Sequence, residues 1–413
     1  MTFDFTSQAL LTANEKVIRP YNDSLTNSRL QTVPLSGLPH ANYVYSLALT
    51  SNPFRIMCTG DSIGGVYIWD AFASINGDQL MSRQSKMGLV DTITRNGVLL
   101  GSFESFENPQ DQKDPSPVSG LDVHSEGLWC LAGTAKGKIN MHSVRLKPGA
   151  YIHTFAGHVD TVSDIKISDS QTSAVSGDSK GKLNVWDLNT GKVKNVFTCL
   201  SSQITHIEFQ PINKSKKKDN IFLAMSQDGN FSIFDSRQQK PAKEITTTPD
   251  TPPWGLSAYF SDNGSKILVG RRDTSIEEYE KGVLAKKYKL PFNSGPVAHA
   301  KYLPNGHAIC ASIDNIRIAN LPEYDAIMST SHKNEEFQTP FEIQSSHHGG
   351  PISRLAIDNN HEFLCTSLGL RDWAVDMFSS GVSTTFQLSS KAKKPLDTST
   401  GHVNCLLYQI RIK

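Results

Sequence analysis

The side chains best suited to bind a metal ion in this sequence are its histidines and cysteines, and their spacing does not favour a metal site. His347 and His348 are adjacent, and adjacent side chains of an extended strand point to opposite faces. His402 follows at neither a helical nor a hairpin spacing, and the six cysteines include no CxxC pair. We therefore expect no metal ion and no cofactor, with cysteines that are reduced and packed as small apolar side chains.

Residue patterns that perform covalent chemistry are also missing from the sequence. It contains no GxSxG elbow, no Walker loop and no HExxH helix, and no Cys/His/Asn group is recognisable. A catalytic site can be assembled from residues scattered along a chain, so an enzyme stays the least favoured alternative. We predict that the protein is not an enzyme.

The charge balance bears on the kind of partner. Lysine and arginine number 41 and aspartate and glutamate 40, so the formal net charge is +1. A chain this close to neutral lacks the positive excess of nucleic-acid binders, and we expect no direct sequence-specific contact with nucleic acid. The basic runs 214–218 and 391–394 fall in predicted loops, where most such runs are solvated; a nuclear-import signal and a contact to an acidic partner are the alternatives. Without a signal peptide or a long apolar window, the protein is expected to be intracellular and to bind no membrane.

Tryptophan and arginine supply a more informative pattern, because these residue types dominate the energetics of many binding surfaces. Pro253 and Trp254 end a Thr-Pro-Pro-Trp stretch, and Arg271 and Arg272 lie on a short link between two predicted strands. We take these four residues as candidate partner contacts. The alternative is a tryptophan packed between structural units with an arginine stacked on it.

The elements that must position these residues are short strands. Alternating or apolar runs, separated by Gly, Asp and Ser turns, return about every 40 residues, which is the spacing of four-stranded propeller blades. The clearest unit spans residues 157–197, with period-two alternation at 161–167 and further strand-like runs at 172–177, 182–187 and 192–197. Its Gly-His … Trp-Asp frame resembles the WD repeat.

Weaker copies of this unit predict an all-β, seven-bladed propeller over residues 29–413, with six or eight blades as less favoured counts. The last blade lacks its outermost strand, and the extended stretch 29–35 has no other place. We predict that this stretch pairs with the C-terminal blade and closes the ring, which removes an open sheet edge. Residues 1–28 are assigned as an N-terminal extension, and insertions are expected at 71–116, 320–340 and 368–404.

The WD resemblance implies a buried hydrogen-bonded chain of His, Ser or Thr, Asp and Trp that holds the strands of a blade together, here called the tether. His158, Ser176 and Trp186 match this pattern. Counting back from Trp186, the usual aspartate position holds Lys180, and the carboxylate is at Asp178 instead. We therefore expect an incomplete tether in this blade and mostly none elsewhere, with a structural role for His158 because buried polar groups need partners.

Seven stretches carry features beyond the strand repeat: residues 116–123, 252–257, 269–272, 290–297, 310–317, 347–350 and 366–373. Together they resemble the WD-repeat subunit of the SAGA transcription coactivator, the fungal subunit that acts on the TATA-binding protein. The resemblance runs from about residue 43 to the C-terminus. His347, His348, Arg371 and Trp373 lie in these stretches and join the candidate partner contacts.

This resemblance implies a non-enzymatic nuclear subunit that contacts the TATA-binding protein, docks beside a histone-fold subunit and other subunits of SAGA, and regulates initiation by RNA polymerase II. Members of that family carry a long acidic segment before the propeller, whereas residues 1–40 here are not acidic, and a polar insertion separates Trp373 from Cys405. One alternative is a propeller that reads a histone tail or another peptide in its central channel. Another is a substrate receptor of a ubiquitin ligase, although neither Trp69 nor Trp186 begins the Trp-Asp-x-Arg box common in that class.

Overall fold

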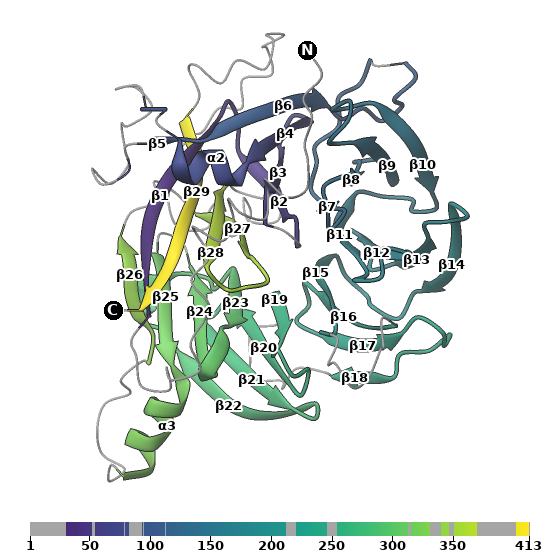
Figure 1. The fold of residues 1–413 in the computed structure, drawn as a ribbon. Coiled ribbons are helices and arrows are strands. Elements are labelled where there is room, and N and C mark those ends of the chain that lie inside the picture. The colour runs from purple at the N-terminus through teal and green to yellow at the C-terminus, as the bar shows by residue number, and fades with distance from the viewer. Residues whose placement is uncertain are drawn as a thin grey trace.

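The computed structural model describes residues 30–51, 54–77, 79–81, 93, 95–111, 113–211, 220–245, 254–312, 315–330, 340–346, 351–369 and 402–412. These residues form seven sheets around a central axis, and Figure 1 shows the innermost strands gathered near the centre. The predicted all-β, seven-bladed propeller is confirmed.

The blades are numbered along the chain, and the strands of each blade are named from the centre outward. Blade 1 consists of β2 (Val44–Leu49), β3 (Ile56–Asp61), β4 (Gly65–Asp70) and β6 (Val98–Glu104). Blade 2 consists of β7 (Leu121–Val123), β8 (Trp129–Gly133), β9 (Lys138–Ser143) and β10 (Tyr151–Ala156). Blade 3 consists of β11 (Val162–Ile167), β12 (Ser173–Asp178), β13 (Leu183–Asp187) and β14 (Lys192–Phe197). Blade 4 consists of β15 (Ile204–Phe209), β16 (Ile221–Ser226), β17 (Phe231–Asp235) and β18 (Lys243–Ile245).

The remaining blades follow the same plan. Blade 5 consists of β19 (Gly255–Phe260), β20 (Lys266–Arg271), β21 (Ser275–Glu280) and β22 (Val283–Lys289). Blade 6 consists of β23 (His299–Tyr302), β24 (His307–Ala311), β25 (Asn315–Asn320) and β26 (Glu342–Ser346), with 3-10 turns at Phe292–Ser294 and Pro304–Gly306 beside it. Blade 7 consists of β27 (Ile352–Ile357), β28 (Phe363–Leu368), β29 (His402–Ile412), β1 (Leu30–His40) and the short β5 (Arg95–Asn96).

The core lies between neighbouring blades, because both faces of each sheet are covered by the next sheet in the ring. Between blades 3 and 4, for example, Val175 and Leu183 belong to one apolar cluster with Phe222 and Phe234. The two phenylalanine rings stack with their centroids 5.1 Å apart. Burial of such side chains supplies the main driving force for folding, at about 1.5–3 kcal/mol for each large apolar side chain. Five of the six cysteines are free and buried in this core: Cys58, Cys130, Cys310, Cys365 and Cys405. Cys199 is exposed, so the expectation of packed cysteines was wrong for that residue.

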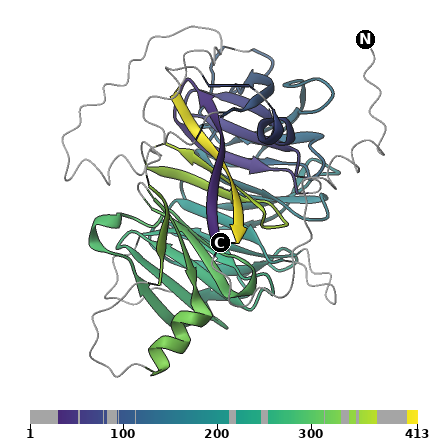
Figure 2. The same cartoon turned by 60° about the vertical axis from the view of Figure 1, so that its left-hand side comes forward.

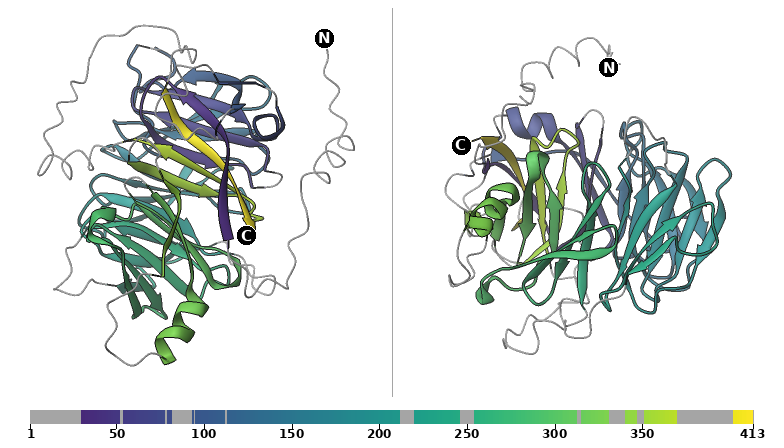
Figure 3. Two further views of the ribbon diagram at one scale, coloured as in Figure 1. Left: turned by 90° about the vertical axis from the view of Figure 1, so that its left-hand side faces the viewer. Right: turned by 90° about the horizontal axis from the view of Figure 1, so that it is seen from below.

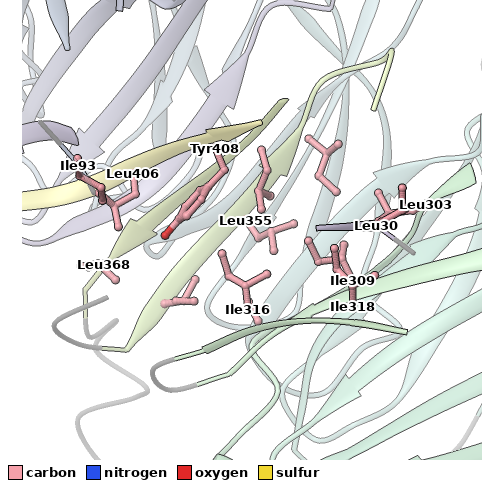
Figure 4. Close-up of a cluster of buried hydrophobic side chains, with 14 of the residues drawn as sticks. Leu30, Ile93, Leu303, Ile309, Ile316, Ile318, Leu355, Leu368, Leu406 and Tyr408 are labelled. Atoms are coloured by element: carbon pink, nitrogen blue, oxygen red, sulfur yellow. The ribbon is translucent and has the colours of Figure 1, made fainter. Parts of the chain in front are cut away.

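The ring is closed by the two ends of the described chain. Strand β1 pairs antiparallel with β29 from Leu30 opposite Ile412 to His40 opposite His402, and Figure 2 shows the two strands side by side. This confirms the prediction that the N-terminal strand completes the C-terminal blade. Leu30 and Tyr408 join a buried cluster with side chains of blade 6, among them Ile316 (Figure 4). The closure is therefore held by backbone hydrogen bonds and by apolar packing across two blades.

The segment 71–116 does more than separate two blades. It contains the helix α2 (Ala71–Asn76), whose N-cap Asp70 accepts the backbone N–H of Ala73 at 2.8 Å. It also supplies β6, the outer strand of blade 1, and β5, which pairs in parallel with β1 through Ser36 and Gly37. We expected this whole segment to be an insertion between blades, but part of it, β6, is the fourth strand of blade 1. By adding β5, the segment also covers part of the outer edge of the closing strand.

The segment 320–340 begins with the helix α3 (Leu321–Thr330), which stands outside the ring of blades in Figure 3. The described part of the segment 368–404 consists of its first two residues and the start of β29. Among the residues that the structure describes, no helix has the length and apolar character needed to cross a membrane.

Candidate functional site

The tether of blade 3 is complete. The His158 ring lies with Nδ1 3.0 Å from Asp178 Oδ2 and with Nε2 2.6 Å from Ser176 Oγ. Trp186 Nε1–H donates to the same Ser176 oxygen at 2.7 Å. Because a carboxylate only accepts, Nδ1–H of His158 donates to Asp178 and Nε2 accepts from the serine hydroxyl. The expectation of an incomplete tether was therefore wrong: Asp178 supplies the carboxylate that Lys180 cannot.

Asp178 can fill this place because it ends β12 and also caps the turn that follows. Its Oδ1 accepts the backbone N–H groups of Lys180 at 3.0 Å and Lys182 at 2.9 Å, which leaves Oδ2 free to accept from His158. Gly181 has a φ of 83°, which a side chain would strain. Burial acts to raise the pKa of Asp178, but the hydrogen bonds from His158 and from the turn outweigh it and hold that pKa below its ordinary value.

A second tether joins blade 1 to the closing strand. His40, the last residue of β1, lies with Nε2 2.7 Å from Thr59 Oγ1, and Trp69 Nε1–H donates to the same oxygen at 3.1 Å. The other ring nitrogen, Nδ1, pairs with the backbone carbonyl of Leu38 at 2.9 Å rather than with a carboxylate. Burial lowers the pKa of His40 to about 4, so the ring is neutral near pH 7. The expectation that tethers are mostly missing outside blade 3 overlooked this one.

Arg271 occupies the same position in blade 5 as Asp178 does in blade 3, because it ends the second strand opposite the first residue of the inner strand. Its side chain is fully buried. Nε–H donates to Glu277 Oε2 at 2.8 Å, and Nη1–H donates to the backbone carbonyl of Gly229 in blade 4 at 2.8 Å. Nη2 lies 3.3 Å from the Tyr279 hydroxyl. Arg271 thus joins two blades and is not a partner contact, because a fully buried guanidinium cannot reach a partner.

Trp254 and Arg272 form a stacked pair. The guanidinium carbon of Arg272 lies 4.3 Å from the centroid of the Trp254 ring, and the Arg272 backbone N–H donates to the Trp254 carbonyl at 3.2 Å. Both residues are partly exposed. A cation over a tryptophan face is worth about 0.5–1 kcal/mol at an exposed site, so the pair fixes the direction of the arginine while leaving it accessible. This geometry agrees with an arginine stacked on the tryptophan, and it keeps both residues as candidate contacts.

The stack and the tether of blade 3 share one face of the ring, here called the tether face. It consists of the loops that lead into the innermost strands and the turns between second and third strands. Trp254 directly precedes β19 and Arg272 directly follows β20, just as His158 precedes β11 and Asp178 ends β12. The other candidate contacts lie outside the described residues and are Pro253, His347, His348, Arg371 and Trp373.

Comparison with known proteins adds to this geometry. A family model described as the SPT8 beta propeller matches residues 30–219 and 215–386, which together make up most of the chain. The chain belongs to the SPT8 β-propeller family. It is 28% identical to the SAGA complex subunit Spt8 of Schizosaccharomyces pombe, over 84% of this chain and 78% of that protein. It is 27% identical to the SAGA complex subunit SPT8 of Saccharomyces cerevisiae, over 87% of this chain and 74% of that protein.

A shorter match shows how much of the similarity is general to propellers. The methylosome protein WDR77 of Xenopus laevis is 28% identical, but over 37% of this chain and 50% of that protein. The similarity to the two yeast Spt8 proteins extends across most of the ring, as the stretches beyond the strand repeat led us to expect.

In this member of the SPT8 β-propeller family, charged side chains meet inside the central channel. Side chains alternate along a strand, so residues two positions apart on an innermost strand point to the same side. Asp164, His206, His299 and Arg354 hold equivalent positions in blades 3, 4, 6 and 7. Arg354 Nη2 lies 2.7 Å from Asp164 Oδ1. Blades 3 and 7 are not neighbours in the ring, so this ion pair spans the channel.

A second tier of channel residues lies two positions further along the same strands. It includes Asp122, Lys166, Glu208 and Lys301, in blades 2, 3, 4 and 6. Lys166 Nζ lies 3.7 Å from Asp122 Oδ1. Burial raises the pKa of Glu208 to about 7, against the opposing effect of Lys301. Sequence reasoning did not single out either tier, although comparing the same position in successive inner strands could have found both.

The described residues contain no group of three or more His, Cys, Asp or Glu side chains placed to hold a metal ion. Two ion pairs, Arg354–Asp164 and Lys166–Asp122, join channel residues, and the tether residues are buried within their blades. On the tether face, the described surface presents to a partner the stacked side chains of Trp254 and Arg272.

Proposed function

We propose that this chain is a non-enzymatic adaptor subunit of the nuclear SAGA coactivator that contacts the TATA-binding protein and regulates initiation by RNA polymerase II. The observation that carries the proposal is the similarity to two yeast SAGA subunits over more than four-fifths of the chain. It extends through blades that bear little of the WD pattern, so it reflects more than a shared repeat.

The geometry of the tether face supports a binding role. Trp254 and Arg272 are residue types that dominate binding energy, and stacking holds them in place before a partner arrives. Arg272 directly follows Arg271, which the buried Glu277 holds in place within blade 5. A partner surface that offers a carboxylate or carbonyl to the guanidinium and an apolar rim to the tryptophan fits this pair.

The alternative of a propeller that reads a histone tail in its central channel receives less support. The Arg354–Asp164 ion pair occupies the channel at the level of its first tier. A peptide that entered this far would have to separate two largely buried charges, which costs several kcal/mol unless the peptide replaces both partners. The channel acts here as an internal brace of the ring.

The test is affinity purification of the tagged full-length protein from nuclear extract of the cells that express it. We expect the other SAGA subunits to be recovered in amounts comparable with the bait, and the TATA-binding protein in smaller amounts. Lys180→Glu is the matched control for a tether-face variant such as Arg272→Glu, because Lys180 lies on the same face, in blade 3, with a largely exposed side chain. Recovery of the bait without SAGA subunits would contradict the proposal.

A further inference from the structure

A cavity of about 310 Å³ lies between blades 5 and 6, on the face of the ring opposite the tether face. Its walls come from the turn after β19, the turn after β23, the strands β20 and β21, and the first turn of α3. Because α3 belongs to the segment 320–340, part of the cavity wall lies outside the repeated blade framework. The cavity plays no part in the function proposed above.

Carboxylates from three different elements line this cavity. Asp262 comes from the turn after β19, Glu278 from β21, and Asp325 from α3. The lining contains one lysine, Lys266. Three carboxylates against one ammonium group make the cavity acidic, although the chain as a whole is nearly neutral.

The three carboxylates are neutralised to different degrees. Lys266 Nζ lies 2.6 Å from Glu278, and Asp325 pairs with Lys286, which is outside the lining. The ion-pair neighbour of Asp262 among the described residues is His361, at 3.7 Å. Burial and then Lys301 lower the pKa of His361, so its neutral form is favoured. Asp262, whose side chain is 58% exposed, therefore presents a negative charge that the described residues do not balance at close range.

An unpaired polar group in the lining also points to a ligand. It is not the buried Tyr302 hydroxyl, which faces the Glu278 carboxylate; burial and this carboxylate together raise the Tyr302 pKa. The unpaired group is the amide nitrogen Nδ2 of Asn305, a buried atom with no acceptor in the described structure. Buried donors are rarely left unpaired, because each costs about 1–3 kcal/mol. A ligand that fits here brings an acceptor as well as a positive charge.

We propose that this cavity binds a lysine or arginine side chain of a partner polypeptide. The aliphatic stem would pack against Leu303, Leu321 and Pro322, as long basic side chains do on apolar surfaces. The cationic end would meet Asp262 and Asp325. A backbone carbonyl beside the basic residue would accept from the unpaired Nδ2 of Asn305. An anionic ligand such as a phosphate fits poorly, because the carboxylates would repel it.

The experiment uses the full-length protein with methyl-labelled leucine and N-acetyl-arginine amide as the probe. The methyl signals of Leu303 and Leu321 report on the cavity, and Leu183, in the core between blades 3 and 4, serves as a distant reference. We expect saturable shifts of the first two signals, with a Kd of about 1 mM, and no shift of Leu183. N-acetyl-norleucine amide, which lacks the charge, should bind at least ~10-fold more weakly.

Two variants separate recognition from folding. The double variant Asp262→Asn/Asp325→Asn changes two partly exposed side chains, so the fold should persist while probe affinity falls at least ~10-fold. Glu126→Gln alters an exposed carboxylate in the corresponding turn of blade 2 and should leave affinity unchanged. The inference is overturned if the wild-type Leu303 and Leu321 signals do not respond to the probe, if the neutral probe binds equally well, or if the double variant binds like the wild type.

Discussion

Arg354 in blade 7 and Asp164 in blade 3 meet across the central channel, with Nη2 and Oδ1 2.7 Å apart. Both side chains are largely buried. The second oxygen of Asp164 accepts the backbone N–H of Ile207 in blade 4 at 2.8 Å. The ring is thus closed twice: at its rim by the pairing of β1 with β29, and at its centre by an ion pair between two blades that are not neighbours.

Removing one member of this pair should destabilise the propeller. Arg354→Leu leaves the Asp164 carboxylate buried without its cation, and such an uncompensated charge costs about 3–5 kcal/mol. Asp164→Asn should cost a similar amount, because it leaves the guanidinium unpaired. Unfolding by denaturant, followed by tryptophan fluorescence, measures both. The double variant should be more stable than the sum of the single losses implies, by at least ~1 kcal/mol; additive losses would show that the two side chains do not interact.

The blade 3 tether should contribute a smaller amount. Ser176→Ala removes the oxygen that accepts from Trp186 and donates to His158, which leaves two buried polar nitrogens without a partner. The expected loss is about 1–3 kcal/mol in the free energy of unfolding. Ser170→Ala, in an exposed turn of the same blade, should change stability by less than about 0.5 kcal/mol. Equal effects of the two substitutions would argue against the tether.

The tether at the end of the closing strand should make stability depend on pH. The pKa of His40 is about 4 in the folded protein, against an ordinary value of 6.5, so the unfolded chain takes up the proton first as pH falls. The His40 contribution to stability should therefore be constant above about pH 6.5 and decline by up to about 3 kcal/mol as pH falls to 4, whereas Glu208, with its raised pKa, acts in the opposite direction over the same range. Denaturant unfolding at a series of pH values measures this decline.

A substitution isolates the His40 contribution to that decline. His40→Gln should lower stability at pH 7 but flatten its dependence between pH 6.5 and 4. His153→Gln, which changes an exposed histidine of blade 2, should leave the shape of the curve as in the wild type. If the His40→Gln curve runs parallel to the wild-type curve, another group causes the loss.

Charge reversal should cost far more stability at Arg271 than at Arg272. Arg271→Glu places a second carboxylate against Glu277 in a fully buried site and should cost several kcal/mol or prevent folding. Arg272→Glu loses a partly exposed stacking contact worth about 1 kcal/mol at most. Thermal melting of the two variants checks the order. A stable Arg271→Glu protein would contradict the buried role assigned to that residue.

The sequence alone could not predict which of these two adjacent arginines is buried. Both belong to a residue type typical of binding sites, and nothing in their immediate neighbourhood distinguishes them. Their positions relative to the end of β20 do so, since Arg271 still belongs to the strand and Arg272 follows it. In the same way, Asp178 was recognised as a carboxylate near the tether, but its distance from Trp186 led us to expect an incomplete tether, which Asp178 in fact completes.

The number of blades and the closure of the ring could be predicted, because both rest on strand-sized patterns that repeat. Strand β6 could not: its residues are exposed or half-buried, so it lacks the apolar alternation by which an inner strand is recognised. The Arg354–Asp164 pair could not be predicted from the sequence either, because it joins residues 190 positions apart that meet only when the whole ring closes. The cavity beside α3 depends on where an inserted segment folds back, which no repeat determines.

The most direct test of the proposed adaptor role is the affinity of the purified full-length protein for purified TATA-binding protein, measured by interferometry. We predict that the wild type binds, that Trp254→Ala weakens binding by ~30-fold and Arg272→Glu by at least ~10-fold, and that Lys180→Glu binds as the wild type does. Unchanged affinity in both tether-face variants would remove Trp254 and Arg272 from the contact surface. If the wild-type protein does not bind the TATA-binding protein, the proposed adaptor role is contradicted.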